Sequence, residues 1–192
     1  MSAGVRHSFV LSVFLVWVIG VGAGLATLWS YENEPGPSAS APARWPAATQ
    51  LVRSEGRVVA VVALHPQCPC SRATVAELAR LVAHAAGRIE IHALFVAPPS
   101  VDESWARTPL WDDAAAIPGV HVSRDDGTEA RRFGARVSGQ MLVYDGAGRL
   151  AFNGGITGSR GHEGDNAGRS AVESLIAGRP HASSTFVFGC LL

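Results

Sequence analysis

The pattern of apolar and polar positions divides the chain into a long apolar segment near the amino terminus and a globular part. Residues 9–29 contain 21 residues without a single charge, and a helix of that length, rising about 1.5 Å per residue, spans the ~30 Å hydrocarbon core of a membrane. Residues 30–49 lose all periodicity and are rich in Pro, Ala and Ser, which is typical of a tether. The pattern therefore predicts a transmembrane helix over residues 9–29, a linker over residues 30–49 and a globular domain over residues 50–192.

The apolar segment has two interpretations, a cleaved signal peptide or a retained anchor. Gly24 and Ala26 offer small residues for a processing site, but the apolar run exceeds the about 7–15 residues of a signal-peptide core. Arg6 and His7 precede the segment and two glutamates follow it, which favours a cytoplasmic amino terminus over residues 1–8. We expect a single-pass protein of the bacterial inner membrane, with its carboxyl-terminal domain in the periplasm.

Within the globular part, the apolar pattern alternates between strands and helices. Residues 57–65 form a near-continuous valine-rich run, as expected for a central strand covered on both faces. Apolar residues then recur at helical spacing over 75–82, and a second strand pattern covers 89–96, which predicts a parallel βαβ unit. Further elements are expected as a helix over 103–116, a strand over 119–125, a short helix through Phe133, a hairpin of 141–144 and 150–152, and a closing helix that ends at Gly178.

This element order predicts the fold class. A parallel βαβ half precedes an antiparallel hairpin half, and two cysteines stand at the amino end of the first helix of the domain. We expect an α/β thioredoxin-like fold, in which helices flank a central mixed sheet, preceded by one transmembrane helix.

Composition narrows the function classes. Basic and acidic residues balance at 16 each, so the charge favours neither nucleic acid nor an anionic surface as a partner. The basic residues are all arginine, and the richness in Ala, Gly and Arg indicates a bacterial, GC-rich source. Three cysteines are too few for a disulfide-built scaffold, so we expect them to perform local chemistry.

The motif Cys68-Pro69-Cys70 lies where the strand gives way to the helix. A helix amino terminus presents unpaired N–H groups and the positive end of the helix dipole, and both favour a thiolate over a thiol. Arg72 and His65 are placed to add positive charge nearby. We predict that Cys68 is the nucleophile and the more exposed of the two cysteines.

The third cysteine, Cys190, follows the apolar stretch "TFVF" close to the end of the chain. Its position allows the tail to fold back toward the cysteine motif, where Cys190 would act as the resolving thiol. Cys70 is the alternative resolving residue. A tail cysteine that packs against the sheet without a chemical role is the other interpretation.

The stretch "GGITGSRGHEGDNAG" predicts a loop between the hairpin and the last helix. In this loop, Arg160 suits the binding of a carboxylate or another anion, and His162 suits a role as acid, base or ligand. Asn166 suits either a role in the chemistry of this loop or a role as the cap of the following helix. The other interpretation is a solvated turn without chemistry.

The cysteines also allow a metal site, because soft thiolates select Cu(I) or zinc. A third ligand would come from His65, His162 or Cys190, and the set of Cys68, Cys70 and His162 is the leading alternative. Zinc is disfavoured because the chain lacks the second cysteine pair of a structural zinc site.

Three stretches together resemble a known family. "HPQCPCSR", "GGITGSRGHEGDNAG" and the terminal "FGC" are most similar to the membrane-anchored, RedB-like subgroup of the thioredoxin-like superfamily, over Arg57 to Leu192. The chain departs from the superfamily in two places. Its CxC motif is one residue shorter than CxxC, and Gly139 stands where the resemblance implies a cis-proline that shapes the substrate-docking backbone.

These observations predict a membrane-tethered, extracytoplasmic thiol-disulfide oxidoreductase that uses the CxC motif and no cofactor. Its expected partners are protein or small-molecule thiols and disulfides, with no nucleic acid. The alternatives are a Cu(I)-binding, metallochaperone-like module similar to the Sco proteins, which use CxxxC, and a thiol peroxidase.

Overall fold

The computed structural model describes residues 3–37 and 40–192. The chain divides after Glu34 into an amino-terminal unit and a second unit that begins at Pro35. Residues 1–2 of the expected cytoplasmic terminus and residues 38–39 of the expected linker lie outside the described residues.

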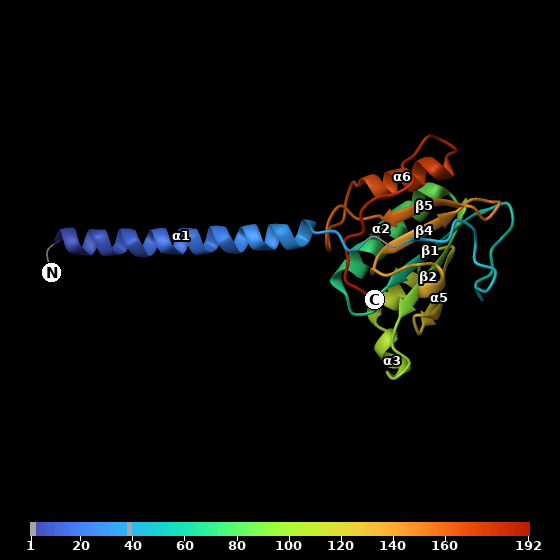
Figure 1. The fold of residues 1–192 in the computed structure, drawn as a ribbon, viewed down its shortest axis with the longest axis horizontal. Coiled ribbons are helices and arrows are strands. Elements are labelled where there is room, and N and C mark those ends of the chain that lie inside the picture. Colours follow the sequence, from blue (N-terminus) through green and yellow to red (C-terminus); the bar gives the residue numbers. More distant parts are fainter. Residues whose placement is uncertain (1–2, 38–39) are drawn as a thin grey trace. The chain divides into compact units, whose positions relative to one another are not determined.

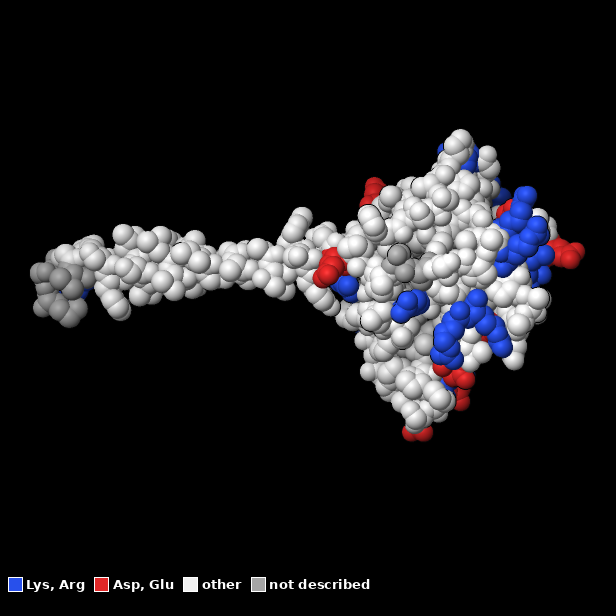
Figure 2. Space-filling view, in the orientation of Figure 1, with Lys and Arg blue, Asp and Glu red and all other residues white. Residues whose placement is uncertain are grey.

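The amino-terminal unit consists of helix α1 (Ala3–Asn33). Its stretch Arg6–Asn33, 28 residues long, is long and apolar enough to cross a membrane, by length and composition. Figure 2 shows the middle of this helix without charged side chains. The structure therefore confirms an apolar helix that contains residues 9–29.

The second unit is built on a five-stranded mixed sheet with the order β3-β2-β1-β4-β5 (Figure 1). The central strand β1 pairs in parallel with β2, and β2 pairs in parallel with β3. On the other side β1 pairs antiparallel with β4, which pairs antiparallel with β5. This is the thioredoxin-like arrangement, as predicted. The strands are β1 (Val58–Leu64), β2 (Ile89–Val96), β3 (Val120–Asp125), β4 (Gln140–Tyr144) and β5 (Leu150–Gly155).

Five helices connect or follow these strands: α2 (Pro69–Ala85), α3 (Glu103–Ala106), α4 (Pro109–Ala115), α5 (Thr128–Arg132) and α6 (Ala167–Ile176). The single helix predicted over 103–116 is wrong, because α3 and α4 are separate. Pro109 begins α4, and Thr108 before it has an extended backbone with φ −89° and ψ 169°. Proline disfavours a helical conformation in the residue before it, which accounts for the break.

Two apolar cores lie on opposite faces of the sheet. On one face, alternate residues of β1 such as Val62 pack with residues of α2, α4 and α6. On the other face, the intervening residues such as Val61 pack with α5 and Phe133. Because β1 is covered on both faces, its sequence is a continuous apolar run rather than an alternating one.

Part of the segment predicted as a linker packs on the second core. The ring of Trp45 lies edge-on to Phe133 and Tyr144, with ring centroids 4.9 and 5.2 Å away. The hydroxyl of Tyr144 donates a hydrogen bond of 3.2 Å to the carbonyl oxygen of Pro42. The compact unit therefore begins nearer the amino terminus than residue 50.

Candidate active site

The two cysteines of the CxC motif lie at the junction of β1 and α2. Cys68 is the residue before the helix, with an extended backbone, and Pro69 occupies the first helical turn, where its missing N–H costs no hydrogen bond. The backbone N–H of Ser71 donates to the carbonyl oxygen of Cys68 at 3.0 Å, and the N–H of Cys68 donates to that of His65 at 3.2 Å. The motif is thus fixed at the amino end of α2, as the sequence indicates.

The carboxyl-terminal tail brings the third cysteine to this point. The Sγ atoms of Cys68 and Cys190 are 3.6 Å apart. The three sulfur atoms of Cys68, Cys70 and Cys190 all lie within 4.8 Å of one another. Among the described residues, this is the one group of three or more His, Cys, Asp or Glu side chains with the spacing of metal ligands.

Cys68 and Cys70 are equally buried, each with 7% of its surface exposed, whereas Cys190 is exposed. The expectation that Cys68 is the more exposed of the pair is therefore wrong, because the tail cysteine contacts its sulfur. Cys68 nevertheless lines a cavity of about 430 Å³, together with Arg72, Thr108 and Glu163, and Cys70 does not line it. A reagent can therefore approach Cys68 from this side.

The electrostatics of the three thiols differ. A hydrogen bond from the Cys70 thiol is the main cause that lowers the pKa of Cys68 to about 4; burial opposes it, and the backbone N–H groups of Ser71 and Cys70 reinforce it. The same hydrogen bond raises the pKa of Cys70, and burial raises it further. Burial, followed by the contact with Cys68, raises the pKa of Cys190. At neutral pH, Cys68 is therefore the thiolate, and the other two are thiols.

Backbone hydrogen bonds hold the carboxyl-terminal tail, residues 183–192, against the tail-binding segment, residues 136–138, which precedes β4. The N–H of Ser138 donates to the carbonyl oxygen of Cys190 at 2.8 Å, and the N–H of Leu192 donates to that of Arg136 at 3.0 Å. A Cβ atom on Gly189 would lie 1.9 Å from the carbonyl oxygen of Ser138. Glycine at position 189 is therefore needed for the tail to come this close.

Arg160, in the loop before α6, also holds the tail. Its guanidinium donates a hydrogen bond to the carbonyl oxygen of Gly189 and acts electrostatically on Cys70 and Cys190. The loop residue predicted to bind an anion thus lies beside the cysteines and contacts the residue before Cys190.

A buried pair of serines, which the sequence analysis missed, ties the CxC loop to the tail-binding segment. The hydroxyl oxygens of Ser71 and Ser138 are 2.6 Å apart, and both side chains are fully buried. The backbone N–H of His65 donates to both hydroxyl oxygens, at 3.1 and 2.9 Å. These bonds keep the segment that holds the tail in register with the cysteine motif.

Gly139, which follows that segment, has a backbone φ of +89°, which residues other than glycine rarely adopt. Its N–H donates to the carbonyl oxygen of Ala63 at 2.7 Å. A Cβ atom here would lie 2.8 Å from Oγ1 of Thr74, whose hydroxyl donates to the carbonyl oxygen of Cys70 at 3.1 Å. Glycine thus permits close packing against the helix turn that carries Cys70.

The remaining predicted residues do not join the sulfur group. The ring of His65 packs edge-on against Trp105, with centroids 5.3 Å apart, and its Nδ1 accepts a hydrogen bond of 3.2 Å from the N–H of Gln67. Arg72 is exposed at the cavity beside Cys68. His162 is exposed and does not belong to the group of three sulfur ligands.

A buried ion pair connects α2 to α6 and to the loop that carries Arg160. Glu77 is completely buried and accepts hydrogen bonds of 2.7 Å from Nε of Arg169 and 2.8 Å from the N–H of Gly164. The side chain of Asn166 accepts a 2.8 Å hydrogen bond from the N–H of Arg169 and so caps α6, as one interpretation of the sequence held. Neither Glu77 nor Arg169 was among the residues predicted from the sequence.

We expect Glu77→Ala to lower the free energy of unfolding by about 3 kcal/mol, because removing one partner of a buried ion pair leaves the other charge uncompensated. The loss is at the low end of the usual range, because Arg169 keeps its hydrogen bonds to Asp165 and Glu173. The matched control is Glu163→Ala, which removes an exposed partner of Arg80 and should cost about 0–1 kcal/mol. Urea unfolding of the detergent-solubilised full-length chain measures both, and equal losses would contradict the role of Glu77.

Comparison with solved structures finds the same kind of fold. A hypothetical protein from Sinorhizobium meliloti superimposes with a TM-score of 0.56 and 18% identity, over 71% of this chain and 79% of that one. An uncharacterized conserved protein from Geobacillus kaustophilus superimposes with a TM-score of 0.59 and 16% identity, over 83% and 90%. At these identities the likeness shows the fold alone.

Comparisons with models of protein families and with curated proteins give no match. The sheet topology shows a thioredoxin-like fold, and the amino-terminal helix is apolar. The resemblance to the RedB-like subgroup stays a prediction.

Proposed function

We propose that the protein is a membrane-tethered thiol-disulfide oxidoreductase in which Cys68 attacks the substrate disulfide and Cys190 resolves the product. The observation that carries this proposal is the 3.6 Å distance between the sulfur atoms of Cys68 and Cys190, with Cys68 held as the thiolate. A disulfide bond is about 2.05 Å long, so closure requires an approach of about 1.5 Å.

The reaction has two exchange steps. The Cys68 thiolate attacks one sulfur of a substrate disulfide, forms a mixed disulfide and releases the other sulfur as a thiolate. The sulfur of Cys190 then attacks Sγ of Cys68, closes a Cys68–Cys190 disulfide and releases the second substrate sulfur, which takes the proton that Cys190 loses. The substrate gains two electrons from the protein, and an external thiol reductant supplies two more that reduce the Cys68–Cys190 disulfide to the dithiol.

Cys70 has a different role in this scheme. Its thiol donates the hydrogen bond that stabilises the Cys68 thiolate, and its own raised pKa leaves it mainly protonated at neutral pH. Cys190 is better placed than Cys70 to resolve the mixed disulfide, because its Sγ lies 3.6 Å from that of Cys68 and it is exposed on the tail, whereas Cys70 is held in the first turn of α2.

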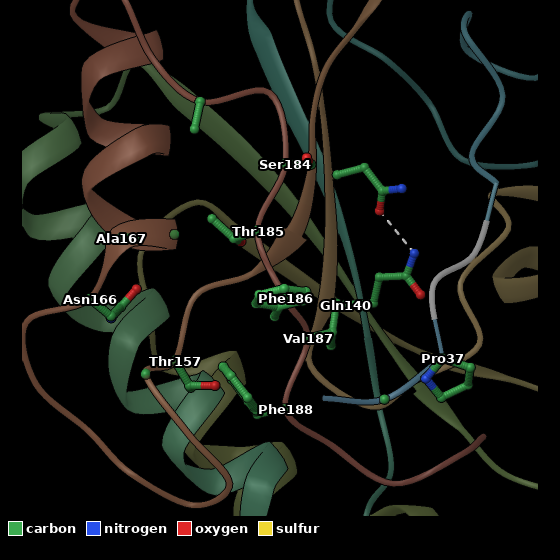
Figure 3. Close-up of a pocket in the computed structure, with 15 residues that line it drawn as sticks. Pro37, Gln140, Thr157, Asn166, Ala167, Ser184, Thr185, Phe186, Val187 and Phe188 are labelled. Carbon is green, nitrogen blue, oxygen red and sulfur yellow. Dashed lines mark hydrogen bonds between the residues drawn. The ribbon is translucent and has the colours of Figure 1, made fainter. Parts of the chain in front are cut away.

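A small reagent can reach Cys68 through the cavity beside it, whereas a bulky disulfide substrate requires the tail to move, because Cys190 contacts the sulfur of Cys68. Beneath the tail lies a cavity of about 730 Å³, lined by Phe186, Phe188 and Gln140 among others (Figure 3). Gln140 donates a 2.9 Å hydrogen bond to the side chain of Asn153, which also lines this cavity. The tail is held largely by backbone hydrogen bonds, and its ring at Phe186 is 70% exposed. Lifting it breaks these hydrogen bonds and uncovers the half-buried side chains of Val187 and Phe188, so the tail is closed at rest and opens by a local event that costs less than global unfolding.

The proposal places the domain outside the cytoplasm, with α1 as a retained anchor. Disulfide chemistry persists in oxidising compartments. Arg6 and His7 at the start of α1 support a cytoplasmic amino terminus.

The test is catalysis of disulfide reduction by the full-length protein in detergent, with a fluorescent peptide disulfide as substrate and dithiothreitol as donor. We expect a rate above that of dithiothreitol alone, which Cys68→Ser removes. A wild-type rate equal to the uncatalysed one would overturn the proposed function.

The lowered pKa of Cys68 predicts an unusual pH dependence of its alkylation. Because its pKa is about 4, Cys68 is a thiolate throughout the neutral range, and its rate of reaction with iodoacetamide should be nearly constant between about pH 6 and 8. The rate should fall only as the pH drops toward 4. Peptide mass spectrometry after timed alkylation measures this, with Cys190 as the internal control, since its rate should rise with pH. A tenfold rise per pH unit at Cys68 would contradict the assigned thiolate.

A further inference from the structure

We propose that, in the reduced protein, Cys68, Cys70 and Cys190 together bind a single Cu(I) ion through their three sulfur atoms. This inference goes beyond thiol-disulfide exchange, because it requires all three sulfurs at once and involves no transfer of electrons. It also replaces His162, the leading third ligand on sequence grounds, with the tail cysteine.

The spacing of the three sulfurs fits one metal ion. Three sulfurs placed evenly around an ion at a metal–sulfur distance of about 2.3 Å lie about 4 Å from one another. The Cys68–Cys190 separation is 3.6 Å, and no separation within the group exceeds 4.8 Å. Each sulfur therefore needs to shift by less than about 1 Å, which a small rotation of the side chain supplies.

The number and type of ligands select the ion. Thiolate sulfur is a soft ligand that favours Cu(I) and zinc over harder ions. Structural zinc is almost always bound by four protein ligands in a tetrahedron, and no further His, Cys, Asp or Glu joins the group in the part of the chain that the structure describes. Three sulfurs without a fourth ligand suit Cu(I), which accepts three-coordinate geometry.

The surroundings favour a bound ion that can also be transferred. Cys68 and Cys70 are buried, so the protein encloses an ion between them except at the cavity beside Cys68. The guanidinium of Arg160 acts electrostatically on Cys70 and Cys190 and offsets part of the negative charge of three thiolates. Cys190 is exposed on a tail held by backbone hydrogen bonds, so one ligand can leave to admit a partner thiol.

Copper binding and disulfide formation exclude each other at this site. A Cys68–Cys190 disulfide removes two of the three ligands, while Cu(I) bound to the reduced form shifts the equilibrium away from the disulfide. The oxidised wild-type protein is therefore a control that needs no substitution.

The test titrates the reduced full-length protein in detergent, without oxygen, with Cu(I) in competition with bicinchoninate. We expect one ion per chain, and X-ray absorption should show three sulfur neighbours at about 2.3 Å. Cys190→Ser should weaken binding by more than about 100-fold, since a direct ligand should matter more than the 10–100-fold of an outer partner. His162→Ala is the matched control and should bind as the wild type does.

Four results would overturn the three-sulfur site: unchanged affinity in Cys190→Ser, lost affinity in His162→Ala, more than one ion per chain, or equal binding by the oxidised protein. Tighter binding of Zn(II) than of Cu(I) would overturn the assigned ion. Copper binding without catalysis of disulfide reduction would support the three-sulfur site and reject the proposed exchange function. Catalysis without copper binding would support the exchange function and reject the three-sulfur site.

Discussion

Cys68→Ser is expected to abolish the mixed disulfide that the wild-type protein forms with an aromatic test disulfide, because the sulfur that the site stabilises as a thiolate at neutral pH is then missing. Cys190→Ser should have the opposite effect and accumulate the mixed disulfide to nearly one per chain, because the sulfur 3.6 Å from Cys68 is then missing. Intact-mass spectrometry of the full-length protein after brief incubation measures both species.

Cys70→Ala serves as the third arm of this experiment. It removes the main hydrogen bond to the Cys68 sulfur, so the pKa of Cys68 should rise and the attack should slow at pH 6 while approaching the wild-type rate at higher pH. Accumulation of the mixed disulfide in Cys70→Ala rather than in Cys190→Ser would mean that Cys70 is the resolving residue, against the present assignment.

Gly189→Val is expected to release the tail and slow closure of the Cys68–Cys190 disulfide by about 100-fold, because two sulfurs held in contact have a far higher effective concentration than the same groups on a free tail. The cause is steric, since the added Cβ would lie 1.9 Å from the backbone oxygen of Ser138. Timed oxidation by glutathione disulfide, quenched by alkylation, gives the rate of closure.

Gly158→Ala is the matched control for that substitution. A Cβ at position 158 meets only the Cβ of Asn166, at the ordinary contact distance of 3.9 Å, so the closure rate should not change. Formation of the mixed disulfide at Cys68 should survive in Gly189→Val, because the motif at the start of α2 is untouched. Closure at the wild-type rate in Gly189→Val would show that tail seating does not position Cys190.

The fold could be predicted from the sequence because its signals are local. The valine-rich run of β1 and the helical spacing in α2 each indicate their element within a few residues. Trp45 illustrates what such signals miss. It packs on Phe133 and Tyr144 from a stretch of Pro and Ala without periodicity, and only the folded sheet supplies its partners.

The residues of the site also fall into two groups, those indicated by the local sequence and those that only the fold brings together. Cys68 and Cys70 were predicted as the reactive pair because motif, strand end and helix start are adjacent in the sequence. The contact of Cys68 with Cys190 joins residues 122 positions apart, and the ion pair of Glu77 with Arg169 joins residues 92 positions apart. A glutamate between apolar residues on the buried face of α2 was the one sequence signal for that pair.

The central claim is that Cys68 and Cys190 form the redox pair, and disulfide mapping of the full-length protein tests it most directly. After oxidation by glutathione disulfide, the free thiols are alkylated and the chain is cleaved with trypsin, which leaves Cys68 and Cys70 in the peptide 58–72 and Cys190 in the peptide 170–192. We predict that these two peptides are joined through Cys68 and that Cys70 carries the alkyl group. A closed Cys68–Cys70 disulfide with Cys190 alkylated would contradict the account.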